Sequence, residues 1–305
     1  MSTVYFLVQQ MMFFSIPLLI VALGGMFSER SGVVNIALEG IMVMGAFCSI
    51  FFINKMQAFM SGNLLLILAI VVAALSGLVF ALLHAYAAIN MRADQTISGT
   101  ALNMIAPAVA IYLARTLQDN GVQQISFTNT FRIESVPVLG DIPVIGPLFF
   151  QNTYITTYLG IGILLISALV LYKTRFGLRL RACGENPQAA DSLGINVYRM
   201  RYAGVMISGI LGGIGGLVYI TAGVSEWKFE NGVAGFGFLA LAVMIFGQWK
   251  PLRIALAALL FGLFRSLSNV YNMLPYIISL VVLALTSKNS RAPKAEGIPY
   301  DKGSR

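Results

Sequence analysis

Four polar side chains lie inside long apolar stretches of this sequence, where each of them could bind a passing polar solute. Asn35 and Glu39 are four residues apart, a spacing that predicts one shared face of a helix. Thr100 and Asn103 fall on one stripe of a later apolar stretch. A charge at the centre of a membrane helix costs roughly 2.5–3.5 kcal/mol, so such residues are functional candidates. Two interpretations stay open: the four line a solute pathway, or they form hydrogen bonds between helices.

The sequence offers few residues suited to catalysis or metal binding. The single histidine, His84, lies in an apolar stretch, so histidine-based triads and zinc sites lack partners, and we expect a hydrogen-bonded packing role. The sequence has no Gly-x-x-x-x-Gly-Lys-Ser/Thr motif, so the chain does not bind ATP through a P-loop. We therefore expect no catalytic residues, no resident cofactor and no metal site.

The composition is that of a membrane protein. Of the 305 residues, 58% are hydrophobic and only 10% are charged, with a mean hydropathy of +0.81. A soluble protein of this size carries far more charge on its surface. We predict an all-α polytopic membrane protein, one transmembrane domain over residues 1–305, with about eight to ten transmembrane helices. The candidate spans are 4–27, 37–53, 64–89, 97–115, 153–172, 202–222, 236–249, 252–271 and 274–287.

Several candidate spans are shorter than the roughly 20 residues that cross a bilayer, which predicts broken or re-entrant helices surrounded by protein. One span contains a run of glycines from Gly209 to Gly216. Its Gly-x-x-x-Gly spacing predicts close helix packing rather than a nucleotide-binding loop.

The net charge of +8 predicts orientation rather than a nucleic-acid surface. Basic residues concentrate in alternate connecting segments, above all 173–201 and 288–305. By the positive-inside rule these segments are a cytoplasmic loop and a cytoplasmic tail, whereas 116–152 is an extracellular loop that could carry a short hairpin or an interfacial helix. With nine spans, the N-terminus lies outside the cell and the C-terminus inside.

The cytoplasmic loop contains a polar run that reads RACGENPQAADSLGIN, residues 181–196. Asn186 followed by Pro187 predicts a helix N-cap and first helical residue, and Gly194 predicts the end of a short helix. This loop therefore carries a capped helix outside the bilayer.

Three blocks of the sequence resemble one family over essentially the whole chain. They are GGMFSERSGVVNIALEGIMVMGAF (24–47), RFGLRLRACGENPQAADSLGINVYRMRYAGVMISGILGGIGG (175–216) and APKAEGIPYDKGSR (292–305). They are similar to permease subunits of bacterial ABC importers in the branched-chain-amino-acid and ribose permease family, and most similar to its nucleoside (riboside) branch.

The resemblance implies that the capped helix is a coupling helix, which docks on an ATP-binding subunit that holds MgATP. Its matching residues are Gly184, Glu185, Asn186, Pro187 and Ala190. The implied partners are a homologous permease that forms a heterodimer with this chain, an ATP-binding protein that is often duplicated, a substrate-binding lipoprotein, a nucleoside and membrane lipid, without nucleic acid. The implied location is the bacterial cell membrane.

Two alternatives stay open. A simple sugar or a branched-chain amino acid would use a similar inventory of polar and aromatic residues. An ion-coupled secondary transporter would need acidic residues within more than one span, and Glu39 is the only acid well inside one.

Overall fold

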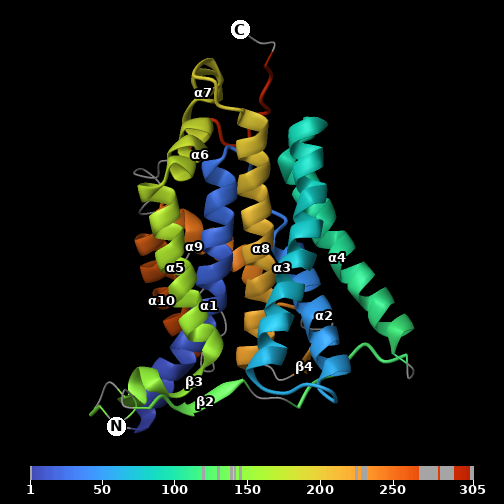
Figure 1. Ribbon diagram of the computed structural model, residues 1–305, viewed down its shortest axis with the longest axis vertical. Helices are drawn as coiled ribbons and strands as arrows, with labels where there is room; N and C mark the ends of the chain where they lie inside the picture. The colour runs from blue at the N-terminus through green and yellow to red at the C-terminus, as the bar shows by residue number, and fades with distance from the viewer. Residues whose placement is uncertain are drawn as a thin grey trace.

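The chain folds into a bundle of long helices with structurally different ends (Figure 1). The computed structural model describes residues 2–118, 121–128, 131–137, 140, 142–143, 146–223, 226–227, 232–267, 281 and 292–302. The long helices are α1 (Ser2–Arg30), α2 (Leu38–Met56), α3 (Asn63–Ala85), α4 (Gln95–Leu117), α5 (Ile155–Lys173) and α8 (Val197–Gly223). A π-helical turn, η1 (Tyr86–Asn90), extends α3.

These six helices are long and apolar enough to cross a membrane, counting only the part of the chain that the structure describes. They correspond to the first six predicted spans. The next two predicted spans are α9 (Phe236–Phe246) and α10 (Pro251–Leu267). With 11 residues, α9 is shorter than the roughly 20 needed for a full crossing, which confirms the prediction of short helices. The described part of α10 has 17 residues. The predicted span 274–287 lies outside the described residues, apart from Val281.

Helix α8 is the centre of packing and lies against α1, α2 and α3. Its glycines explain the closeness of these contacts. A Cβ added at Gly213 would overlap the backbone of Ala73 in α3, and one added at Gly216 would overlap the backbone of Met42 in α2. The glycine run therefore serves helix packing, as its spacing predicts.

The expectation that Asn35 and Glu39 share a helix face is wrong. Helix α1 ends at Arg30 and α2 begins only at Leu38, so residues 31–37 form a non-helical break that contains Asn35. Gly32 takes a φ of +95°, a conformation open to glycine but strained for other residues, and this turns the chain out of the helix.

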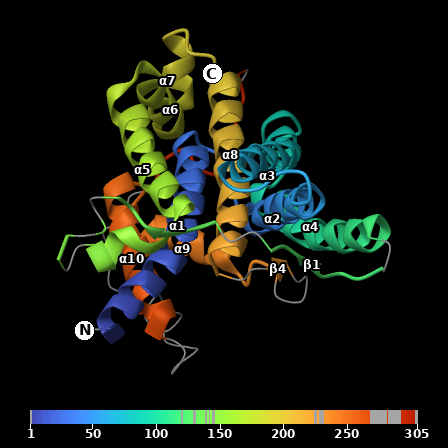
Figure 2. The same cartoon turned by 60° about the horizontal axis from the view of Figure 1, so that its bottom comes forward.

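One end of the bundle carries the N-terminus and the predicted loop 116–152 (Figure 1). Strand β2 (Arg132–Ser135) pairs antiparallel with β3 (Gln151–Tyr154), which follows the π-helical turn η2 (Gly146–Phe150). A second pair joins β1 (Ile125–Ser126) to β4 (Glu226–Trp227), as the view from this end shows (Figure 2). The expected hairpin is confirmed in β2 and β3. We call this the strand end.

The opposite end carries two helices from the predicted 173–201 loop, α6 (Arg175–Glu185) and α7 (Pro187–Ser192). Residues 292–302 of the C-terminal segment lie at the same end. We call this the coupling end, after the coupling helix that the resemblance implies. The N-terminus and the C-terminal segment therefore occupy opposite ends of the bundle, as the predicted topology requires.

Candidate functional site

The break at residues 31–37 lies inside the bundle, and polar side chains from other helices bind its backbone. His84 Nε2 lies 2.8 Å from the carbonyl oxygen of Val34, and the backbone N–H of Val34 donates to Gln95 Oε1 at 2.7 Å. Asn103 donates to the carbonyl oxygen of Ile36 at 2.9 Å. Non-helical backbone at membrane depth is tolerated where protein groups satisfy it. These side chains therefore satisfy the backbone polar groups of the break inside the bundle. The expected hydrogen-bonded role of His84 is confirmed.

Asn35 is fully buried within the break. Its Nδ2 atom donates to Ser208 Oγ of α8 at 2.8 Å. Its Oδ1 atom is also buried and has no hydrogen-bond partner among the described residues. A buried acceptor without a partner costs about 1–3 kcal/mol, so a site that retains one needs an explanation.

Glu39 joins the starts of α2 and α9. Its carboxylate accepts hydrogen bonds from the backbone N–H groups of Gly235, at 3.0 Å, and Gly237, at 2.6 Å. These two glycines flank Phe236, the first residue of α9, and a Cβ on Gly237 would overlap the Glu39 backbone. The carboxylate thus satisfies the N-terminal donors of α9, where the helix dipole also favours a negative charge.

The structure brings three of the four predicted pathway residues together where the break (31–37), the start of α2 and the start of α9 meet. We call this place the broken-helix centre. Asn35 and Glu39 lie in the break and at the start of α2, and Asn103 binds both Ile36 and the N–H of Gly40, the latter at 2.8 Å. Thr100 is exposed on α4, and its hydroxyl donates to the carbonyl oxygen of Thr96 at 2.8 Å. Thr100 therefore points away from the break.

The short helix predicted in the polar run is present as α7. The Asn186 side chain accepts a hydrogen bond from the N–H of Ala189 at 3.0 Å, with Pro187 in the first helical turn. Gly194 follows with a φ of +79°. This confirms the N-cap and the glycine terminator. Gly184 and Ala190 are buried, whereas Glu185 and Asn186 are exposed.

Helix α6 is absent from our sequence-based expectations. The side chain of Thr174 caps it by accepting a hydrogen bond from the N–H of Gly177 at 3.1 Å. Its buried residues include Gly177, Leu180, Cys183 and Gly184, at helical spacing. A threonine cap followed by this periodicity is a sufficient sequence signal, although many basic residues interrupt the run.

The coupling end touches the end of α1 directly. A Cβ added at Gly184 would overlap the carbonyl oxygen of Arg30, and Glu185 lies 3.9 Å from the Arg30 guanidinium. Arg30 also donates to the carbonyl oxygen of Trp249, at 3.1 and 3.3 Å. The indole N–H of Trp249 in turn donates to the buried carboxylate of Glu29. One arginine thus connects α6, the break and the turn between α9 and α10. Sequence reasoning missed Trp249.

The C-terminal segment packs onto the coupling end. The N–H of Ala295 donates to the carbonyl oxygen of Gly184 at 2.8 Å, and buried Arg201 donates to the carbonyl oxygen of Ile298 at 3.0 Å. Asp301 forms an ion pair with Arg92, which follows η1, at 2.9 Å. The segment therefore links α6, α8 and the connection between α3 and α4.

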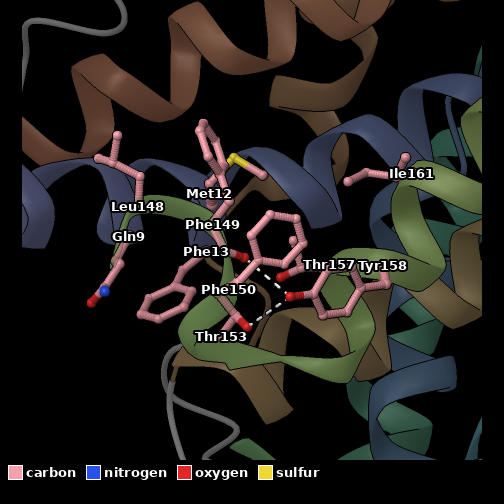
Figure 3. Close-up of a pocket in the computed structure, with 10 residues that line it drawn as sticks. All are labelled: Gln9, Met12, Phe13, Leu148, Phe149, Phe150, Thr153, Thr157, Tyr158 and Ile161. Atoms are coloured by element: carbon pink, nitrogen blue, oxygen red, sulfur yellow. Dashed lines mark hydrogen bonds between the residues drawn. The ribbon is translucent and has the colours of Figure 1, made fainter. Parts of the chain in front are cut away.

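An apolar pocket of about 280 Å³ opens at the strand end, between α1, η2, β3 and α5 (Figure 3). The hydroxyl groups on its wall bind protein atoms. Tyr158 donates to the carbonyl oxygen of Phe149 at 3.1 Å and lies 3.2 Å from Thr153 Oγ1. Its lining offers few polar contacts to a hydrophilic solute. Within the described residues, no group of three His, Cys, Asp or Glu side chains could hold a metal ion.

Comparison with known proteins adds a family and named relatives. The family described as branched-chain amino acid transport system / permease component matches residues 7–287. The chain is 45% identical to the nucleoside ABC transporter permease protein NupC of Lactococcus lactis subsp. cremoris (strain MG1363), over 99% of this chain and 98% of that protein. It is 44% identical to the guanosine ABC transporter permease protein NupQ of Bacillus subtilis (strain 168), over 96% and 95%.

A second Lactococcus lactis protein of the same strain, the nucleoside ABC transporter permease protein NupB, is 26% identical over 82% of this chain and 69% of that protein. No solved structure matches the chain.

Proposed function

The chain belongs to the branched-chain amino acid transport system / permease component family, and from that premise we propose that it is the permease subunit of an ATP-driven ABC importer for nucleosides. The observation that carries this proposal is the contact from α6 through Arg30 to the break and to the turn after α9. A movement of α6 would act through these contacts on α2 and α9, which meet at Glu39.

The coupling segment suits a soluble protein partner. Glu185 and Asn186 are exposed, and Leu193 at the end of α7 exposes 81% of its surface. We assign the docking surface for an ATP-binding subunit to the segment that contains Gly184, Glu185, Asn186, Pro187 and Ala190, in which the buried Gly184 and Ala190 set the shape and the exposed Glu185 and Asn186 touch the partner.

The polar route through the protein passes the broken-helix centre. Asn35 presents its buried Oδ1 to the solute, Glu39 fixes the start of α9, and Asn103 holds the break. Thr100 lies on the outer face of α4, where a second permease would complete the route. The N-termini of α2 and α9 meet within the bundle at Glu39, and helix N-termini inside a membrane protein are a recurrent way of building solute sites.

The nucleoside assignment is supported by the similarities at 45% and 44% identity, to a nucleoside permease and a guanosine permease. The heterodimer is supported by the similarity of this chain to two different nucleoside permeases of one organism. The remaining partners are an ATP-binding subunit and a substrate-binding lipoprotein. In the bacterial cell membrane the coupling end faces the cytoplasm and the strand end faces outward, which follows from the basic residues of 173–201.

Two measurements test this proposal. The chain purified alone should not hydrolyse ATP, whereas a complex co-purified with its ATP-binding subunit should, because this sequence lacks a P-loop. Cells that express all subunits should take up labelled guanosine or uridine, and excess glucose or leucine should not compete. ATPase activity in the isolated chain would refute the permease role. Uptake of glucose or leucine in place of nucleosides would refute the substrate.

A further inference from the structure

A second cavity, of about 260 Å³, lies at the strand end beside the apolar pocket of Figure 3. Phe13 lines both cavities. The second cavity is enclosed by α1, α8 and the β2–β3 hairpin. Its lining includes the rings of Phe13, Phe14, Tyr154 and Tyr219, the Gln10 amide and the Arg132 guanidinium, and all of these except Phe13 are absent from the lining of the apolar pocket.

The mixture of aromatic and polar groups separates this cavity from its neighbour. Strand register places Arg132 opposite Tyr154, and Arg132 Nε donates to the carbonyl oxygen of Asn152 at 3.3 Å. The rings of Phe13 and Tyr154 meet edge to face with centroids 4.9 Å apart. Aromatic residues at a membrane end often form a belt at the lipid headgroups. Here half-buried rings enclose one cavity together with an amide and a guanidinium, an arrangement that lipid contact does not require.

The inner wall of this cavity leads to the broken-helix centre. The rings of Phe14 and Tyr219 both lie against Phe236, with centroid distances of 6.2 and 4.4 Å. Phe236 lies between the two glycines whose N–H groups bind Glu39. A ligand in the cavity would therefore touch rings that contact the first residue of α9.

We propose that this cavity is the entry site at which the permease receives a nucleoside, with the base against Tyr219 and Phe14 and its polar edge toward Gln10 and Arg132. This inference rests on the proposed function and adds the site to it. A nucleobase offers a flat π-face for stacking and a hydrogen-bonding edge, whereas glucose lacks the π-face and leucine lacks the edge. The volume is close to the lower end, about 300 Å³, of small-molecule sites. Glu39 is a positioning residue, because it fixes the α9 start and hence Phe236.

Direct binding tests the site. The permease pair with its ATP-binding subunits is placed in lipid nanodiscs without the binding lipoprotein and without nucleotide. Guanosine is titrated, and saturation transfer from the protein to its H8 proton gives a dissociation constant. Tyr219→Leu should weaken binding at least about fivefold through lost stacking. Gln10→Met keeps the volume of the side chain and should weaken binding severalfold through a lost hydrogen bond.

Phe149→Leu is the matched control, because Phe149 lines only the neighbouring apolar pocket and should leave the dissociation constant unchanged. Unchanged guanosine binding in both Tyr219→Leu and Gln10→Met would overturn the entry site, as would equal binding of free ribose or leucine. Uptake by the complete transporter distinguishes a failure of the entry site from a failure of the proposed function. Guanosine uptake by the wild type together with unchanged binding in the variants refutes the site alone. No uptake of any nucleoside refutes the proposed function and the ligand of this site with it.

Discussion

The amides of Asn35 and Asn103 make different contacts, and we expect different consequences when each is lost. Asn103→Leu removes the hydrogen bond to Ile36 in the break and the one to Gly40 in α2, and leaves two backbone groups without these partners. We expect a loss of roughly 1–3 kcal/mol in stability and a lower melting temperature of the complex. Asn35→Leu removes one bond, to Ser208, together with an acceptor that has no partner in the described structure. Here uptake per assembled complex should fall more than the melting temperature.

A valine at Thr116 is a control on the same helix as Asn103, because the Thr116 hydroxyl is exposed and bonds only within α4. Thr116→Val should change neither the uptake per assembled complex nor the melting temperature. Equal melting temperatures for Asn103→Leu and wild type would contradict the holding role of Asn103. Normal uptake per complex in Asn35→Leu would remove Asn35 from the route.

At the residue scale, the sequence predicts which side chains have a role more reliably than it predicts their hydrogen-bond partners. A polar group in an apolar stretch is visible without a structure, and three of the four candidate residues, Asn35, Glu39 and Asn103, meet where the break joins α2. Their partners are not visible in this way, because Gly235 and Ser208 are some 170 or more residues distant. The turn at Gly32 also displaces Asn35 from the helix, and glycine alone does not reveal a positive φ.

At the scale of elements, we expect α6 and α7 to transmit force rather than to stabilise the fold. Glu185→Arg replaces the carboxylate beside the Arg30 guanidinium with a like charge on an exposed surface. We expect normal assembly and lipoprotein docking, with ATP hydrolysis that no longer drives uptake at the wild-type ratio. The measurement is the number of guanosine molecules imported per ATP hydrolysed. Glu134→Arg makes the same charge change on exposed β2 and should keep the ratio. If Glu185→Arg left the number of guanosine molecules imported per ATP unchanged, α6 and α7 would only connect their neighbouring helices and would not transmit force.

The packing of α8 gives a second prediction at this scale. Gly213→Leu places a side chain where even a Cβ overlaps the backbone of Ala73 and approaches Gly77. We expect α8 and α3 to separate, with little assembled complex recovered from membranes. Gly162→Leu is a control in α5, since no atom lies within 4 Å of a Cβ there. Equal yields of both variants would show that α8 tolerates looser packing.

Element boundaries followed from hydropathy because lipid imposes a length on every span. The six long helices begin and end close to the predicted limits. Helix α6 was missed because its charged residues hide a four-residue buried face. The short α9 is explained only by tertiary structure, since Glu39 supplies acceptors to its first N–H groups.

At the scale of the whole molecule, the C-terminal segment closes the coupling end. Cys183 is buried there in a cluster with Ala190, Val197 and Tyr300. Burial raises the pKa of the Cys183 thiol to about 11, so at pH 8 the reactive thiolate is scarce. Alkylation of the native protein should therefore be slow at pH 8 and should accelerate as the pH approaches 11.

Tyr300→Ala should loosen this cluster, return the pKa toward about 8.5 and raise the alkylation rate at pH 8 by tenfold or more. Mass spectrometry of the modified peptide separates Cys183 from Cys48, the other cysteine. Fast alkylation of the wild type would mean that the segment does not cover α6.

The arrangement of the ends was predictable in part. Basic residues alternate between connecting segments, and this pattern places 173–201 and the C-terminal segment together. The docking of Ala295 on Gly184 and the ion pair of Asp301 with Arg92 were not predictable, because short polar segments carry no periodic signal for a distant partner.

Concentrative uptake of guanosine distinguishes ATP-driven import from ion-coupled transport. Vesicles reconstituted with both permeases, the ATP-binding subunit and the binding lipoprotein are supplied with labelled guanosine, in the presence of ionophores that abolish ion gradients. We expect guanosine to accumulate above its external concentration with MgATP on the cytoplasmic side, and not to accumulate with a non-hydrolysable analogue. Accumulation that survives without ATP hydrolysis and instead requires a proton or sodium gradient would contradict this expectation.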